Sequence, residues 1–183
     1  MSETQVDGGP ARRREYTWAD PRATVAALPG RPGIDVLRAV ASGELPPPPV
    51  AAMMGFEIET VEVGRAVFAL EPTEAHYNPL GTVHGGVIAT LLDSAAGCAV
   101  HTVLPVGSGY TTVDLHTTFL RPVTLATGRV TAHGTVLSQG ARTALAEARL
   151  VDGRGRLLAH ATSTCLILDL SRPSGGAAVP AGG

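Results

Sequence analysis

Residues 85–103 read GGVIATLLDSAAGCAVHTV and are apolar over most of their length. The segment is long enough for a helix, and Pro105 and Gly107 follow it as helix-ending residues. Asp93 is its only charged residue. A helix that is apolar nearly all round is normally buried by the rest of its domain. We therefore predict a buried central helix that carries one carboxylate.

Strand-like segments lie on both sides of this helix. Residues 56–63, FEIETVEV, alternate apolar and polar side chains for most of their length, which is typical of a half-buried strand. Turn sequences separate the later segments, and Asp152-Gly153-Arg154-Gly155 is a strong hairpin signal. The order β-β-α-β-β-β-β predicts an α+β protein in which an antiparallel sheet wraps around one long helix. The predicted strands span residues 56–63, 66–70, 110–120, 129–137, 143–151 and 157–168.

The flanks differ in composition from this domain. Residues 1–15 are polar and contain an arginine run, and residues 170–183 are rich in Ser, Gly, Ala and Pro, so both are predicted to be disordered tails. Residues 16–50 form a predicted appendage with one short amphipathic helix after Gly33 and a proline-rich connector at 46–49. The functional domain is therefore expected at residues 51–169.

Overall composition excludes several classes of protein. The 183 residues carry a net charge of −2 and only 4% aromatic residues, which argues against a nucleic-acid partner. No apolar run reaches the roughly 18 residues of a membrane span. The first 14 residues contain no apolar core of a secretory signal, and the chain has two cysteines, so we expect a cytoplasmic protein with reduced thiols.

All 14 basic residues are arginines. The lack of lysine excludes Schiff-base chemistry and a P-loop lysine. Any phosphate held by a side-chain cation must therefore be held by arginine, which can bind it through two parallel hydrogen bonds.

Asp93 is the first candidate for chemistry. A carboxylate buried in mid-helix is costly unless it is paired or used. The competing interpretation is a structural aspartate that bonds a neighbouring serine or backbone group. Small residues share its helix face, which would let a slender ligand or another backbone approach: Gly86, Ala89, Thr90, Ala96 and Gly97.

The second candidate feature is the sequence 78–86, NPLGTVHGG, which leads into the helix. Unpaired N–H groups at a helix start, here Gly85 and Gly86, can stabilise the negative charge on an acyl oxygen. Asn78 offers a further amide donor, and His84 lies beside the glycines. The competing interpretation is a glycine-rich cap in which His84 bonds locally.

The spacing of His84 and Asp93 has a consequence for assembly. Nine residues correspond to about 900°, so the two side chains face opposite ways and lie about 13 Å apart along one helix. One copy cannot easily aim both at a single carbonyl, whereas two copies in a two-fold dimer can. We expect a dimer, and a dimer of dimers is compatible with the low charged fraction of 16%.

The pattern Asn78-x5-His84-Gly85-Gly86-x6-Asp93 resembles the signature of the PaaI-like acyl-CoA thioesterases, which have the hotdog fold. Residues 110–115 and 119–122 are also similar to segments of that family. The resemblance implies a dimer or dimer of dimers whose sheets join edge to edge. It implies hydrolysis of an aryl or short- to medium-chain acyl-CoA, without a cofactor beyond the coenzyme A of the substrate.

Residue roles follow from the same resemblance. Asp93 would act as general base or nucleophile, with Gly85 and Asn78 around the carbonyl oxygen and His84 fixing the loop or contacting the sulfur side. The family often has a serine near the acid; here Thr111 and Thr112 compete for that position. Contacts to coenzyme A are expected from Gly86 and from two arginines, Arg121 and Arg142.

Two other functions stay open. A hotdog hydratase or dehydratase of enoyl thioesters would use the same pocket, and a non-catalytic acyl-CoA-binding module would bind without turnover. The histidines and cysteines show no zinc-like spacing, so no metal is predicted. Cys98 is interpreted as a buried, inert thiol, and no Gly-x-Ser-x-Gly motif supports a serine hydrolase.

Overall fold

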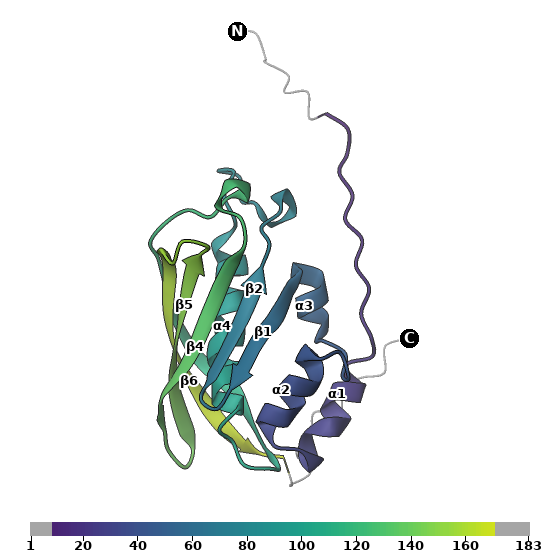
Figure 1. Ribbon diagram of the computed structural model, residues 1–183, viewed down its shortest axis with the longest axis vertical. Helices are drawn as coiled ribbons and strands as arrows, with labels where there is room; N and C mark the ends of the chain where they lie inside the picture. The colour runs from purple at the N-terminus through teal and green to yellow at the C-terminus, as the bar shows by residue number, and fades with distance from the viewer. Residues whose placement is uncertain (1–8, 171–183) are drawn as a thin grey trace.

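The computed structural model describes residues 9–170. Its centre is helix α4 (Gly85–His101), against which one six-stranded antiparallel sheet packs (Figure 1). The sheet order is β1-β2-β4-β5-β6-β3. The predicted α+β architecture is therefore confirmed. The strands are β1 (Phe56–Glu62), β2 (Arg65–Leu70), β3 (Ser108–Phe119), β4 (Val130–Gln139), β5 (Thr143–Asp152) and β6 (Leu157–Asp169).

Helix α4 is buried because its apolar side chains face the concave side of the sheet. Leu91, Leu92 and Ala95 are almost completely inaccessible, as are the inward-facing alanines of β5 and β6. The helix approaches β4 closely, because a Cβ on Gly134 would lie 2.0 Å from the Ala95 carbonyl oxygen. Glycine at this strand position therefore sets how tightly the sheet can close on the helix.

The two ends of the sheet carry different parts of the molecule. The start of α4 and the turn between β5 and β6 lie at one end, while the end of α4 and the turn between β4 and β5 lie at the other (Figure 1). Strands β1 and β3 form the two edges of the sheet. β3 is bonded along its length to β6 and has no second partner strand among residues 9–170.

The N-terminal segment contains more helix than the sequence predicted. Besides the expected helix α2 (Gly33–Ala41), it forms α1 (Arg22–Ala27), the 3₁₀ turn η1 (Leu28–Gly30) and α3 (Pro49–Met54). Proline is favourable at the first position of a helix, so Pro49 begins α3 instead of extending the connector. Helices α1, α2 and α3 lie together beside β1 (Figure 1).

Residues 9–20, which precede these helices, contain no helix or strand. Two of their arginines nevertheless contact the domain. Arg12 forms an ion pair of 2.6 Å with Glu74, and Nη1 of Arg14 lies 3.0 Å from Nε2 of His76. Both partners, Glu74 and His76, belong to the 3₁₀ turn η2 (Glu74–His76). The 3₁₀ turn η3 (Leu125–Thr127) lies between β3 and β4. Of the tails predicted at residues 1–15 and 170–183, residues 1–8 and 171–183 lie outside the described residues.

Candidate active site

The carboxylate of Asp93 is held by a hydroxyl from the neighbouring strand. Oγ1 of Thr112 on β3 donates a hydrogen bond of 2.8 Å to Oδ1 of Asp93, which is half-buried on α4. Within residues 9–170 this is the carboxylate's one hydrogen bond, and it has no ion pair. The Ser94 hydroxyl, a partner considered from sequence, instead donates to the Thr90 carbonyl at 2.8 Å. Asp93 is therefore oriented but not neutralised by a cation.

Strand β3 distinguishes the two candidate threonines. Successive side chains point to opposite faces of a strand, so Thr111 and Thr112 cannot both reach the helix in the same way. Thr112 contacts Asp93, whereas Thr111 is exposed and makes no side-chain hydrogen bond among the described residues.

Asp93 and Thr112 line a cavity of about 920 Å³. This volume is near the upper end for small-molecule sites. Helix α4 and strand β3, which includes Tyr110, form one wall. The N-terminal helices form much of the opposite wall, a contribution that periodicity could not reveal.

The start of α4 is organised by His84. Its backbone is extended, it occupies the N-cap position, and Nδ1 accepts a hydrogen bond of 2.9 Å from the Gly86 N–H. The Gly86 donor is thus used within the protein, which leaves less for a substrate than the sequence suggested. The Gly85 N–H has no acceptor among the described residues, as expected for the first turn of a helix. Gly85 is therefore the available backbone donor at this helix start.

Asn78 shapes the loop that precedes the helix. Its Oδ1 accepts hydrogen bonds from the N–H groups of Leu80 and Thr82, at 2.9 and 3.3 Å, and its Nδ2 donates to Oγ1 of Thr82 at 3.0 Å. Nδ2 carries two hydrogens, so one remains available to another acceptor. Asn78 and Gly85 line a second hollow of about 360 Å³, next to Phe119 of β3.

The two hollows share no lining residue. Gly85 and Asp93 are eight residues apart on α4, which corresponds to about 12 Å along the helix axis. The structure therefore places the candidate oxyanion donors and the candidate carboxylate in separate hollows of one chain. This separation agrees with the geometry expected from the spacing of His84 and Asp93.

The two arginines predicted to contact coenzyme A lie far apart. Arg121 lines the hollow of Asn78 and Gly85, and its Nη1 donates to the Leu157 carbonyl at 2.5 Å. Arg142 precedes β5 at the other end of the sheet. The ten residues of β5 separate the two regions by about 30 Å. One protomer cannot present both guanidinium groups to the same phosphate.

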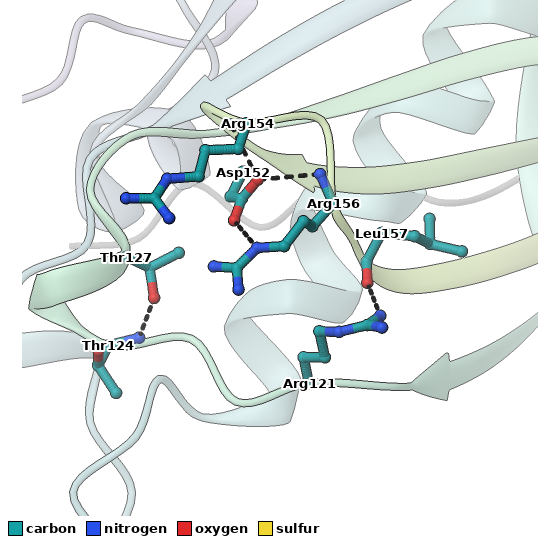
Figure 2. A network of polar contacts seen from close by, with 7 residues as sticks. All are labelled: Arg121, Thr124, Thr127, Asp152, Arg154, Arg156 and Leu157. Carbon is teal, nitrogen blue, oxygen red and sulfur yellow. Dashed lines mark hydrogen bonds and ion pairs between the residues drawn. The ribbon is translucent and has the colours of Figure 1, made fainter.

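Two further arginines, which the sequence did not indicate as site residues, lie near Arg121. Figure 2 shows Arg154 and Arg156 around Asp152, on the turn between β5 and β6. Nε of Arg156 bonds Oδ2 of Asp152 at 2.7 Å, and the backbone N–H groups of Arg154 and Arg156 both bond Oδ1 at 2.9 Å. The sequence marked these residues as a hairpin turn, but only the fold brings that turn beside Arg121.

The Cys98 thiol does not take part in chemistry at this site. Burial raises the pKa of Cys98 to about 12, so this thiol stays protonated and unreactive at neutral pH, in agreement with its interpretation from sequence. Within residues 9–170 no group of three or more His, Cys, Asp or Glu side chains is arranged to hold a metal ion. In the same part of the chain no helix is long and apolar enough to cross a membrane.

A sheet of this strand order wrapped around one long helix defines the hotdog fold. The profile of the thioesterase superfamily matches residues 80–159. The human protein acyl-coenzyme A thioesterase 13 is 33% identical over 103 residues, which are 55% of this chain and 71% of that protein. The chain therefore belongs to the thioesterase superfamily.

Other relatives agree with this assignment. An archaeal protein from Halobacterium salinarum is 41% identical over 73 residues, 39% of this chain and about half (46%) of that relative. The crystal structure of a phenylacetic acid degradation-related protein from Ralstonia eutropha has a TM-score of 0.65 and 30% identity, and the match covers 71% of this chain and 98% of that one. The PaaI protein of Escherichia coli, at 23% identity, has the same fold with a TM-score of 0.65, over 75% of this chain and 95% of that one.

Proposed function

We propose that this protein is an acyl-CoA thioesterase that hydrolyses a coenzyme A thioester to the free acid and coenzyme A. The observation that supports it best is the environment of Asp93. This carboxylate lies in the middle of an apolar helix, is oriented by Thr112, and borders a large cavity. Oδ2 of Asp93 has no partner among the described residues and is therefore available to a substrate or a water molecule in that cavity.

Asp93 can act in this mechanism either as a general base or as a nucleophile. As general base it takes a proton from water while the water oxygen bonds to the carbonyl carbon. As nucleophile it bonds to that carbon itself and forms an anhydride that water then opens. In both cases the carbon–sulfur bond breaks, and the thiolate of coenzyme A leaves and takes up a proton. A thiolate leaves readily, so little acid assistance is needed.

The oxyanion that forms on the carbonyl needs preorganised donors. The free Gly85 N–H at the start of α4 supplies one, supported by the positive end of the helix dipole. The spare hydrogen on Nδ2 of Asn78 supplies a second, while its other contacts keep the loop in place. His84 acts by holding Gly86, and we assign it a positioning role.

These donors and Asp93 meet in a dimer in this proposal. Two chains related by a two-fold axis can place the helix start of one beside the mid-helix carboxylate of the other. The unpaired edge of β3 provides a surface on which two sheets can join. Each dimer would contain two equivalent active sites, and a dimer of dimers is compatible with the same contacts.

Coenzyme A phosphates require cations, and arginine is the available residue. Arg121 is our main candidate because it borders the hollow of Gly85 and Asn78. Arg142 contacts the same coenzyme A only if it comes from the other subunit.

The unpaired cysteines, Cys98 and Cys165, support a reducing compartment such as the cytoplasm as the place of this activity.

The proposal is tested by a panel of acyl-CoA thioesters with detection of free thiol, run on the wild type and on Asp93→Asn. The variant keeps the shape of the side chain and removes the base or nucleophile. We expect kcat to fall about 10²–10⁴-fold with little change in KM. If Asp93→Asn keeps wild-type turnover on the best substrate, the role of Asp93 is structural and the proposed mechanism is wrong.

The same panel separates the alternatives. Water addition to an enoyl-CoA without thiol release would indicate a hydratase, and tight binding without any turnover would indicate a binding module. Single turnover in ¹⁸O-labelled water distinguishes the two roles of Asp93. Direct attack by water labels only the product acid, whereas an anhydride intermediate can leave the label in Asp93.

A further inference from the structure

The cavity beside Asp93 has a wall that the hotdog domain itself does not supply. Four residues of helix α2, Val36, Leu37, Val40 and Ala41, line it. Their spacing of one, three and one residues places them on one face of the helix. The same wall includes Thr24 of α1, Leu28 of η1 and Ala51 of α3, so it spans four elements of the N-terminal segment.

The polar side chains that border this part of the cavity have partners within the protein. The Thr24 hydroxyl donates to the Pro46 carbonyl and the Ser42 hydroxyl donates to the Ala39 carbonyl, both at 3.1 Å. Glu57 of β1, which also borders the cavity, forms an ion pair of 3.0 Å with Arg129. The groups left to contact an occupant on this side are mainly aliphatic.

The cavity extends along α4 from Asp93 to His101. These residues are eight positions apart, so the distance along the helix is about 12 Å. At the His101 end, the start of α2 packs closely against α4, because a Cβ on Gly33 would lie 2.0 Å from Cδ2 of His101. Burial lowers the pKa of His101, and its ring is therefore neutral near pH 7.

The length and lining of the cavity define an occupant. With carbon–carbon bonds of about 1.5 Å and tetrahedral angles, an extended alkyl chain advances about 1.25 Å per carbon. A length of 12 Å therefore accepts a chain of about nine or ten carbons whose carbonyl lies near Asp93. A benzoyl or short-chain acyl group would reach along only part of this length.

We propose that helix α2 forms the outer wall of an acyl chamber and selects medium-length, apolar acyl chains. This inference rests on the proposed thioesterase function, since it places the thioester carbonyl at Asp93. It assigns the N-terminal segment a role in substrate selection that is separate from the chemistry at Asp93.

The test narrows the chamber from the α2 side in the full-length protein. Val40→Phe adds a ring to the lining, and Ala41→Phe does the same from a more exposed position that folding tolerates better. Arg38→Phe is the matched control, because Arg38 is exposed on α2 and does not line the cavity. Hydrolysis is measured with butanoyl-, octanoyl- and decanoyl-CoA.

We expect the wild type to prefer the longer chains, because each buried methylene improves transition-state binding by up to about fourfold. At least one of the two chamber variants should lower kcat/KM for decanoyl-CoA by about tenfold or more while butanoyl-CoA changes less than about twofold. Arg38→Phe should leave both values close to wild type. A wild type without chain-length preference, or equal losses for all chain lengths in both chamber variants, would overturn the proposal.

A binding measurement separates this inference from the hydrolysis itself. S-butyl- and S-decyl-CoA are thioethers without a scissile carbonyl, and their dissociation constants can be measured by calorimetry. We expect S-decyl-CoA to bind at least about 100-fold more tightly, and the chamber variants to remove most of that difference. If the wild type hydrolyses nothing but keeps this preference, the chamber stands and the thioesterase proposal fails. If the wild type hydrolyses thioesters but binds the two thioethers equally well, the thioesterase proposal stands and the chamber proposal fails.

Discussion

At the scale of single residues, the hydrogen bond between Thr112 and Asp93 does the most to define the site. It joins β3 to α4 and fixes one carboxylate oxygen at 2.8 Å while the other remains free for substrate or water. A hydrogen bond to a charged group contributes about 1.5–3 kcal/mol. In the proposed mechanism Thr112 is therefore a positioning residue for Asp93.

This contact predicts different results at two adjacent threonines. Thr112→Val removes the donor and should lower kcat by about 10–100-fold, since the carboxylate loses its orientation. Thr112→Ser keeps the hydroxyl and should remain within about threefold of the wild type. Thr111→Val is the matched control and should have little effect, because its hydroxyl does not contact Asp93. Equal losses in both valine variants would mean that the effect comes from the strand and not from the hydroxyl.

At the scale of secondary-structure elements, the fit between α4 and the sheet depends on close backbone approach. Gly134 of β4 faces the Ala95 carbonyl, and Gly97 of α4 faces the ring of Tyr110, where a Cβ would lie 2.5 Å from Cε2. These contacts hold the helix at a fixed depth and rotation inside the sheet. They thereby position Asp93 against β3.

Gly134→Ala should destabilise the protein without touching the active site. The new methyl group would overlap the Ala95 carbonyl oxygen, and overpacking of this kind costs about 1–3 kcal/mol or more. The expected decrease in Tm is about 3–10 °C for a chain of this size. Gly153→Ala is the control, because nothing lies within 4 Å of a Cβ there. The close approach of β4 and α4 would be refuted if both variants melted at the same temperature.

At the scale of the whole molecule, the separation of the two hollows predicts an active site shared between subunits. Asp93→Asn and Asn78→Ala are each expected to be nearly inactive, the latter by about 10²-fold or more if its amide donates to the oxyanion. When the two inactive variants are co-expressed, mixed dimers contain one intact site. About a quarter of wild-type activity should return, because half of the dimers are mixed and half of their sites are intact.

Subunit mixing also has a clear negative outcome. If both residues act within one chain, the mixture stays inactive. Sedimentation at nanomolar concentration gives an independent check, since a fully active monomer would contradict the shared site.

The stability of the whole molecule should fall in mild acid because two histidines are buried. Burial lowers the pKa of His101, and burial together with the cation of Arg14 lowers that of His76. The His76 ring accepts from the Thr73 N–H at Nδ1 and bonds the Met54 carbonyl at Nε2, an arrangement that suits the neutral form. The folded state therefore resists protonation.

The sign of the pH effect follows by linkage. Between the lowered folded pKa and the ordinary value of 6.5, the unfolded chain binds more protons than the folded one. The free energy of unfolding should be highest above pH 6.5 and decrease as the pH falls through that range. Denaturant unfolding at pH 7.5 and 5.5 measures the difference, and His101→Gln should reduce it. Parallel profiles for His101→Gln and the wild type would exclude a contribution from His101.

Much of this protein follows from the sequence alone because local patterns report burial directly. Apolar side chains over residues 85–103 specify a buried helix, and alternation in segments such as 56–63 specifies half-buried strands. Asp93 is a candidate for chemistry for the same reason, since a lone carboxylate in an apolar helix requires an explanation. These features depend only on neighbours in the chain.

The tertiary structure decided everything that depends on which segments meet. Register across β3 and α4 selected Thr112 over Thr111, and strand length placed Arg121 and Arg142 at opposite ends of the sheet. Packing of α2 beside the end of α4 made the N-terminal segment part of the cavity wall. No local pattern encodes such contacts, because they join residues far apart in sequence whose proximity is fixed only when the core closes.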